Sequence, residues 1–187
     1  YESSAGIGMT CNPYAIFRAF MKMPEFKEYV HIWVIQDAEE LELLKESYRE
    51  YENVVFVFYQ SRAYAYFLAR AKYLINNTSF AGTFSKKEGQ IFLNTWHSIT
   101  VKTLGYDTPD GNRVVGNMVR NLLMSDYIIS PNEFMTEIYE KSFRLKDIYE
   151  GRYICEGYPR NDLVVHTQRE EIFQKMKIRG IEVDPAK

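Results

Sequence analysis

The chain has little of what marks membrane-spanning, disulfide-rich or nucleic-acid-binding proteins. Its longest apolar runs, such as Val54–Tyr59, fall far short of the roughly 20 residues that a membrane-spanning helix needs. Its two cysteines, Cys11 and Cys155, lie far apart and lack the spacing of a zinc site or a disulfide framework, which suits a reducing compartment. The 23 Lys and Arg residues against 25 Asp and Glu leave a net charge of −2, so no bulk charge attracts nucleic acid. The sequence therefore predicts no bilayer crossing, no structural zinc and no nucleic-acid partner.

The chain also starts without a methionine, a charged leader or a cleavable apolar segment. It begins at Tyr1, and we expect it to be a piece of a longer protein rather than a secreted precursor. Its 187 residues, 46% of them hydrophobic and 26% charged, suit one ordinary globular domain. Composition shifts only near the end, so we expect a domain over residues 1–179 and a linker over 180–187.

Short runs rich in Val, Ile, Tyr and Phe alternate with longer amphipathic segments, which is typical of an α/β domain with a doubly wound, mostly parallel sheet. Asn12 is expected to cap the first helix, and Asp37 the second, with Glu40 completing a capping box. Residues 78–89 and 98–111 lack clear periodicity and are expected to be loops. The predicted strands are 30–35, 54–59, 73–76, 90–96, 127–129 and 152–155, and the predicted helices are 12–23, 37–48, 62–72, 112–124, 132–143 and 168–178.

His97 is the strongest candidate for chemistry, because ligands of open α/β sheets bind at the carboxyl ends of the strands and His97 follows the strand predicted at 90–96. Its imidazole could take a proton from an attacking hydroxyl, with Lys102 balancing phosphate charge. The alternative is a half-buried histidine bonded to loop backbone. The other two histidines, His31 and His166, are expected to be structural or solvated.

Two further places follow predicted strands. Ser130 and Glu133 fit a capping box, and the exposed amides of that helix start could bind an anion. Arg160 lies in a predicted turn, where it could grip a phosphate with two hydrogen bonds or pair locally with Asp162.

A dinucleotide-binding pattern is only partly present. Gly6 and Gly8 precede a predicted helix, and Asp37 stands near the place of a ribose-binding acid. The third glycine is missing, with Cys11 in its place. This leaves open a nucleotide- or dinucleotide-binding module without transferase activity, and the aromatic content of 16% leaves open a non-catalytic scaffold that docks a partner.

Several strings, taken in order along the chain, resemble one family over nearly the whole sequence. They are Tyr1-Glu2-Ser3, Asn12-Pro13, Tyr73-Leu74-Ile75-Asn76-Asn77, Asn94-Thr95-Trp96-His97, Lys102-Thr103-Leu104-Gly105, Asn121-Leu122-Leu123, Asp126-Tyr127, Ser130-Pro131-Asn132 and Gly157-Tyr158-Pro159-Arg160-Asn161-Asp162. Together they resemble the CDP-glycerol glycerophosphotransferases, the teichoic acid and capsule polymerases.

The resemblance implies a GT-B architecture, in which this chain is the amino-terminal, acceptor-side Rossmann-like domain and a carboxyl-terminal domain holds most of the donor site. It implies transfer of a polyol phosphate from CDP-glycerol or CDP-ribitol to a hydroxyl of a lipid-linked or polymeric polyol phosphate acceptor, releasing CMP. His97 matches the family histidine proposed as general base. The cleft-lining residues that the resemblance implies are Asn94, Lys102, Ser130, Asn132 and Arg160.

The resemblance also carries expectations about setting. It implies a cytoplasmic protein, peripheral on the inner face of the bacterial cell membrane, whose isolated amino-terminal part is inactive. No cofactor is evident from the sequence. The resemblance leaves open a divalent cation on the donor pyrophosphate, although this chain offers no compact cluster of metal ligands. The family usually has Gly-Thr-Pro-Leu after the histidine where this chain has Ser98-Ile99-Thr100-Val101, which leaves the acceptor and the polyol open.

Overall fold

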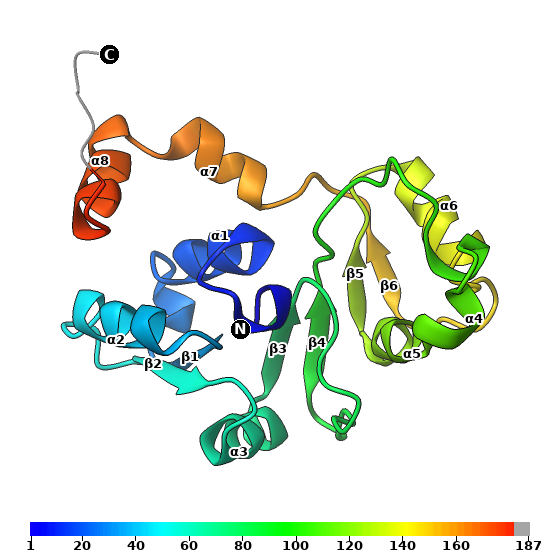
Figure 1. Cartoon of the computed structure of the whole chain (residues 1–187), viewed down its shortest axis with the longest axis horizontal. Helices are drawn as coiled ribbons and strands as arrows, with labels where there is room; N and C mark the ends of the chain where they lie inside the picture. The colour runs from blue at the N-terminus through cyan, green and yellow to red at the C-terminus, as the bar shows by residue number, and fades with distance from the viewer. Residues whose placement is uncertain (182–187) are drawn as a thin grey trace.

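The computed structural model describes residues 1–181 as an α/β fold in which every strand pairing is parallel (Figure 1). The strands are β1 His31–Ile35, β2 Val54–Phe58, β3 Tyr73–Asn76, β4 Ile91–Asn94, β5 Tyr127–Ile129 and β6 Arg152–Ile154. The α-helices are α1 Cys11–Phe20, α2 Ala38–Ser47, α3 Arg62–Arg70, α4 Gly111–Val114, α5 Gly116–Met124, α6 Glu133–Lys141, α7 Arg160–His166 and α8 Arg169–Ile178. Short 3-10 turns span Ser4–Gly6, Pro24–Phe26 and Gly105–Asp107. The predicted fold class is confirmed.

The first two residues join two groups of strands into one sheet. Strands β1 and β2 form one group, and β3, β4, β5 and β6 form the other in that order. The Tyr1 nitrogen donates to Ile32 O at 2.7 Å, and Tyr1 O accepts from Val34 N at 3.1 Å. On the other side, Glu2 N donates to Ile75 O at 3.0 Å. Tyr1 and Glu2 therefore occupy the strand position between β1 and β3.

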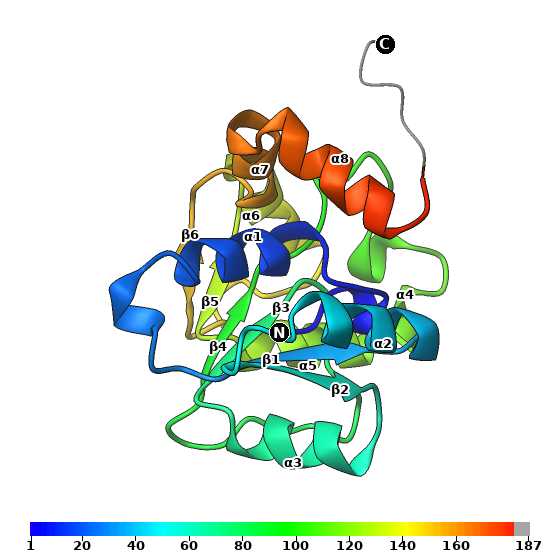
Figure 2. The ribbon, with the colours of Figure 1, turned by 90° about the vertical axis from the view of Figure 1, so that its left-hand side faces the viewer.

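Helices cover both faces of the sheet because alternate strand residues point to opposite sides. Trp33 and Ile35 of β1 pack against Phe17 of α1 and Leu44 of α2. Between them, Val34 packs with Tyr64 of α3 on the opposite face. Figure 2 shows this division, with α3 on one side of β1 and β2 and with α1 and α2 on the other.

The caps of the first two helices only partly agree with the sequence pattern. Thr10 precedes α1, so the prediction that Asn12 caps this helix is wrong, and Asn12 lies inside its first turn. Asp37 does cap α2, accepting from Glu40 N at 2.8 Å. The Glu40 carboxylate bonds Arg179 at 2.6 Å instead of completing the capping box.

Two segments depart from the predicted elements. The helix predicted over 112–124 is interrupted at Val115, which ends α4 and precedes α5. The turn predicted around Arg160 is instead the start of α7, which packs against α1. Within the predicted 98–111 loop, Gly105 has φ +62° and an added Cβ would lie 2.2 Å from Ser142 O, so only glycine fits there. Of the predicted linker, residues 182–187 lie outside the described part, and the proposed domain boundary at 179 stays a prediction.

Candidate active site around His97

His97 lies just past β4, at the carboxyl edge of the sheet, and its side chain is half-buried. Its Nδ1 is 2.9 Å from the carbonyl oxygen of Asn77, which follows β3. A carbonyl oxygen can only accept, so in the neutral ring Nδ1 carries the proton and Nε2 keeps its lone pair. The structure therefore holds the tautomer that a general base working through Nε2 requires.

The turn that presents His97 is conformationally unusual. Trp96 has a left-handed backbone with φ +51°, is buried, and stacks on His97 with the ring centroids 4.8 Å apart. Three other non-glycine residues near the amino-terminal loop, Ser4, Ala5 and Cys11, also have positive φ. Left-handed backbone at non-glycine residues costs free energy and is concentrated at functional sites.

Asn94 supports this turn from beneath. It is fully buried, its Oδ1 accepts from Trp96 N at 3.0 Å, and its Nδ2 donates to Thr78 O at 3.0 Å. Both ends of the amide are therefore used inside the protein. The expectation that Asn94 lines a cleft is corrected, because a side chain with no exposed surface and both polar ends bonded holds the turn instead.

Arg160 is brought directly to His97 from the other end of the sequence. Its guanidinium Nη1 donates to His97 O and lies 3.2 Å from Cys11 Sγ. The guanidinium also stands over the Tyr158 ring, 4.8 Å from its centroid. The Tyr158 hydroxyl donates to Ser98 O at 2.8 Å, so both sides of His97 are fastened to the segment that begins α7.

Ser130 and Asn132 lie at the end of β5, beside β4 on the same edge of the sheet. Asn132 caps α6 by accepting from Met135 N at 2.9 Å, so the prediction that Ser130 is the cap is wrong. Ser130 is buried, and its Oγ donates to Asn132 O at 3.0 Å and pairs with Thr136 Oγ1 at 2.8 Å. Its hydroxyl is thus spent on the helix start, which corrects its expected place in a cleft, whereas the side chain of Asn132 is exposed.

Lys102 stands on the exposed part of the loop after His97. Its backbone N–H donates to Thr100 Oγ1 at 3.0 Å, and this bond shapes the loop. The bond does not involve the ammonium group of the side chain. The structure therefore joins Arg160 directly to His97 and holds the turn before His97 through Asn94. Ser130 and Asn132 lie after the neighbouring strand β5, and Lys102 lies on the loop that follows His97.

Two residues of the site were not found by sequence reasoning. Asn12 donates from Nδ2 to Trp96 O at 2.9 Å and to Thr95 O at 3.3 Å, and its Oδ1 accepts from Arg160 N at 3.2 Å. Asn12 was interpreted from the sequence as a helix cap, and this interpretation hid its contacts with the turn before His97. Asn77 acts through its backbone carbonyl, for which the residue type gives no signal.

Gly6, the first of the two glycines near the start, has a structural explanation. Gly6 has φ +85°, and an added Cβ would lie 3.2 Å from Gln36 N at the end of β1. Asp37, the acid that a dinucleotide site would need, is used as the cap of α2. These contacts favour a tight turn over a dinucleotide-binding loop.

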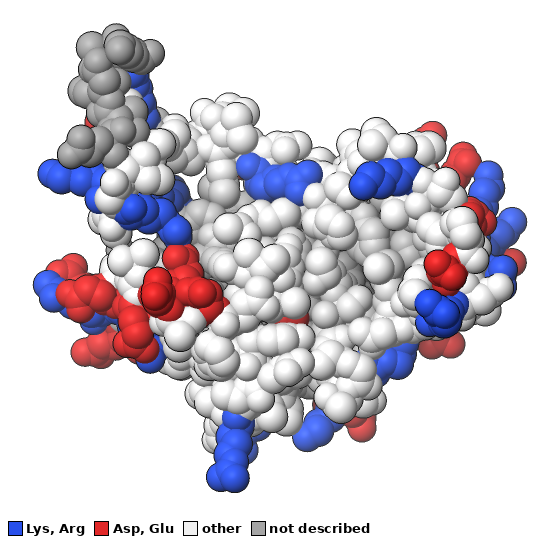
Figure 3. Space-filling view, viewed as in Figure 1, with Lys and Arg blue, Asp and Glu red and all other residues white. Residues whose placement is uncertain are grey.

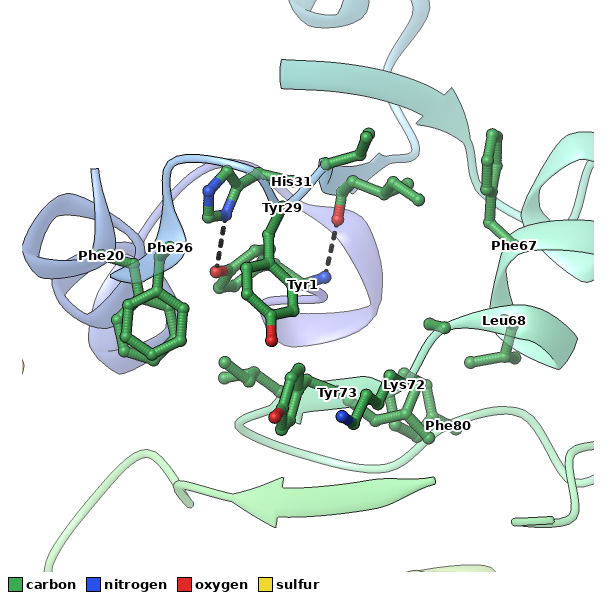
Figure 4. A pocket seen from close by; sticks show the side chains of 15 residues that line it. Tyr1, Phe20, Phe26, Tyr29, His31, Phe67, Leu68, Lys72, Tyr73 and Phe80 are labelled. Atoms are coloured by element: carbon green, nitrogen blue, oxygen red, sulfur yellow. Dashed lines mark hydrogen bonds between the residues drawn. The ribbon is translucent and has the colours of Figure 1, made fainter. Parts of the chain in front are cut away.

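An apolar pocket opens at the opposite edge of the sheet from His97 (Figure 4). It lies beside Tyr1 at the amino ends of β1 and β3, with Phe20, Phe67 and Leu68 in its wall. Ligands of open parallel sheets bind at the carboxyl ends, so this pocket is not the candidate active site.

Figure 3 shows acidic side chains gathered over α2 and a mostly uncharged face over the central strands.

Within residues 1–181, no group of three His, Cys, Asp or Glu side chains could hold a metal ion. In the same part of the chain, every helix is too short or too polar to span a bilayer.

Comparisons with known proteins find relatives over nearly the whole chain. The chain is 30% identical to the teichoic acid poly(glycerol phosphate) polymerase of Bacillus spizizenii, over 98% of this chain and 46% of the relative. It is 27% identical to the protein of the same name from Bacillus subtilis, over 96% of this chain and 23% of the relative. The chain thus spans less than half the length of these relatives.

Solved structures of the wall teichoic acid polymerase TagF share the fold. A histidine-to-alanine variant matches with a TM-score of 0.72 and 23% identity, covering 100% of this chain and 44% of that chain. A histidine-to-asparagine variant soaked with CDPG matches with a TM-score of 0.74 and 23% identity, covering 98% of this chain and 44% of that chain. The sequence model of the CDP-glycerol:poly(glycerophosphate) glycerophosphotransferases matches residues 1–184. The chain therefore belongs to the CDP-glycerol:poly(glycerophosphate) glycerophosphotransferase family.

Proposed function

We propose that this chain is the acceptor-side part of a glycerophosphotransferase in which His97 is the general base. The observation that carries the proposal is the contact between His97 Nδ1 and the Asn77 carbonyl at 2.9 Å, which leaves Nε2 unprotonated at the carboxyl edge of the sheet. An acceptor hydroxyl bonded to Nε2 would lose its proton to that nitrogen as its oxygen attacks phosphorus.

The reaction balances with this one base. A bond forms between the acceptor oxygen and the phosphorus of the glycerol phosphate group, the bond from that phosphorus to the CMP oxygen breaks, and CMP leaves with the electron pair. The proton from the hydroxyl resides on Nε2 until water removes it. Catalysis of phosphoryl transfer rests largely on positioning and on stabilising phosphate charge. We assign that second task on this chain to Lys102, to Arg160 and to the start of α6 at Asn132.

The family membership and the names of the relatives support the proposed substrates. We propose CDP-glycerol as the donor, in preference to CDP-ribitol, because the relatives are poly(glycerol phosphate) polymerases and a TagF variant was soaked with CDPG. We propose a lipid-linked or polymeric glycerol phosphate as the acceptor. Most of the donor site belongs, on this proposal, to a part of the enzyme that these 187 residues do not include, so the isolated chain is inactive.

The remaining proposals concern setting and metal. We propose that the full enzyme works at the inner face of the cell membrane, where a lipid-linked acceptor is held. A divalent cation on the donor pyrophosphate would be held by the donor and by the part of the enzyme that carries the donor site, because residues 1–181 offer no three-ligand cluster for it. We assign no residue of this part of the chain to a metal.

The test is to replace His97 in an enzyme of family length that contains this chain and to follow CMP release. His97→Ala and His97→Gln should each lower kcat by roughly 10²- to 10⁴-fold, the usual contribution of a general base. His166→Ala, which removes an exposed imidazole at the end of α7, is the matched control and should keep normal turnover. Unchanged CMP release in both His97 variants would remove His97 from the mechanism.

A further inference from the structure

Three successive backbone carbonyls, ending with that of His97, accept hydrogen bonds from side chains that lie far away in the sequence. Asn12 Nδ2 donates to Thr95 O and Trp96 O, at 3.3 and 2.9 Å, and the Arg160 guanidinium donates to His97 O. The Thr95 hydroxyl also donates to Trp96 O, at 3.1 Å. The backbone N–H of Arg160 in turn donates to Asn12 Oδ1 at 3.2 Å. Asn12 therefore links the first turn of α1, the turn before His97 and the first residue of α7.

This link acts on a turn that does not hold its shape by itself. The left-handed conformation at Trp96 is costly for a bulky residue and persists only where surrounding contacts fix it. Asn12 is fully buried, so truncating it removes from the protein interior the N–H donor that the Thr95 and Trp96 carbonyls share. The Trp96 carbonyl would then lose a direct hydrogen-bond donor at the point where the backbone is least relaxed.

We propose that Asn12 is a positioning residue for His97. It holds the Thr95 and Trp96 carbonyls so that His97 Nδ1 meets the Asn77 carbonyl, and it makes this alignment depend on the docking of α7 against α1. The inference rests on the proposed role of His97 as base, because its catalytic consequence is the orientation of Nε2. A displaced imidazole would lose the Asn77 contact, and both ring tautomers would then be populated.

The direct readout is the tautomer of His97 in the 187-residue chain, measured by nitrogen NMR of histidine-labelled protein above the titration range. The unsubstituted chain should show one tautomer, protonated at Nδ1. Asn12→Ala should abolish that single-tautomer signature at His97. Asn12→Asp keeps the volume and the acceptor facing Arg160 N but removes both N–H donors, and it should do the same.

Asn121→Ala is the matched control. Asn121 is also fully buried, and its amide is bonded to Phe80 N, Phe80 O and Asn117 O at 2.9, 3.2 and 2.9 Å, away from the His97 turn. This variant should lower the thermal midpoint but leave the His97 signals in place. A merely structural role for Asn12 would make the two alanine variants behave alike at His97.

Unchanged His97 signals in a folded Asn12 variant would overturn the proposal. If Asn12→Ala does not fold, Asn12→Asp decides by the same readout, and failure of both to fold while Asn121→Ala folds would assign Asn12 to stability alone and overturn it too. In the family-length enzyme, Asn12→Ala should lower kcat by roughly 10- to 100-fold with KM unchanged. If the unsubstituted enzyme released no CMP, the proposed function would fail, while the tautomer of His97 would still judge Asn12.

Discussion

Glu2 places a carboxyl group in the middle of the sheet, between β1 and β3. The side chain is fully buried, and its Oε1 accepts from Asn76 Nδ2 at 3.2 Å. Burial raises the pKa of Glu2 to about 7, mainly because the charged form loses its hydration. The folded chain therefore keeps a proton on Glu2 at pH values where the unfolded chain has released it.

This protonation makes stability depend on pH. Between the ordinary pKa of 4.5 and about 7 the folded state binds more protons than the unfolded state, so the free energy of unfolding should fall as pH rises through that range. Glu2→Gln should remove up to about 3 kcal/mol of this fall, as measured by urea unfolding at pH 5 and pH 7.5. Burial lowers the pKa of the Tyr1 amino group to about 6, so above pH 6 this group makes the free energy of unfolding rise with pH. Glu2→Gln and the unsubstituted chain share this effect, and they are therefore compared with each other at each pH. Parallel pH profiles for the two proteins would contradict the assignment.

Single residues of the site were predictable where their type and place in the sequence carried the signal. His97 was found because an imidazole directly after a strand falls at the sheet edge, and the structure places it there. Arg160 was found as an anion-binding candidate, but its contact with His97 spans 63 positions and no local pattern reveals such a contact. The backbone carbonyl of Asn77 was not predictable, because every residue type offers the same group.

At the scale of elements, the start of α2 offers a clean test of a predicted cap. Asp37→Ala removes the bond to Glu40 N and should lower the free energy of unfolding by about 1 kcal/mol. Glu39→Ala is the control, because it removes an acidic charge from the same first turn without touching the cap. Urea unfolding of both variants measures the difference. Equal losses would show that charge near the helix start matters and that the cap bond does not.

Strand boundaries were predicted correctly where the hydrophobic run in the sequence ends at the same residue as the strand. The strands predicted over 73–76 and 127–129 are confirmed without a change of boundary. Strand β4 stops at Asn94, two residues before its predicted end, because Trp96 turns left-handed while staying as buried as a strand residue. Helix α7 was missed because the Gly and Pro residues before Arg160 are typical of a turn and the helix is short.

At the scale of the whole molecule, an ion pair ties the last helix to the first. The Arg18 guanidinium bonds both carboxylate oxygens of Glu171, and Lys175 adds a second contact to Glu171 at 2.9 Å. Helix α8 has no buried residue, and Figure 2 shows α8 running across the side of the molecule that carries α1. The attachment of α8 therefore relies more on charge than on apolar packing.

Glu171→Gln should loosen this attachment. Exposed pairs of this kind contribute roughly 0.5–1 kcal/mol, so cleavage within residues 167–181 by a limiting amount of protease should rise by about threefold. Raised salt should accelerate cleavage of the unsubstituted chain but hardly affect the variant, because the pair is partly exposed and screened. The neighbouring Glu170→Gln is the charge-matched control and should behave like the unsubstituted chain. Identical cleavage of Glu171→Gln and Glu170→Gln would show that the pair does not hold α8.

The parallel α/β architecture followed from the alternation of elements, but the sheet's continuity did not. The sequence gives no strand signal at Tyr1 and Glu2, since two residues are too few for a pattern, yet their bonds to Ile32 and Ile75 join β1 to β3. Such continuity is a tertiary property that only the assembled sheet displays.

The distances along the chain that meet at the His97 turn bear on how the protein folds. Three of the partners of this turn lie 20, 63 and 84 positions away from it, and two of them, Asn12 and Arg160, are 148 positions apart. Closing such wide loops is slow, because the entropy lost on closure is offset only after most of the chain has ordered. We therefore expect the turn to be among the last parts of the molecule to form during refolding. The left-handed conformation of Trp96 should appear only when the native state is complete.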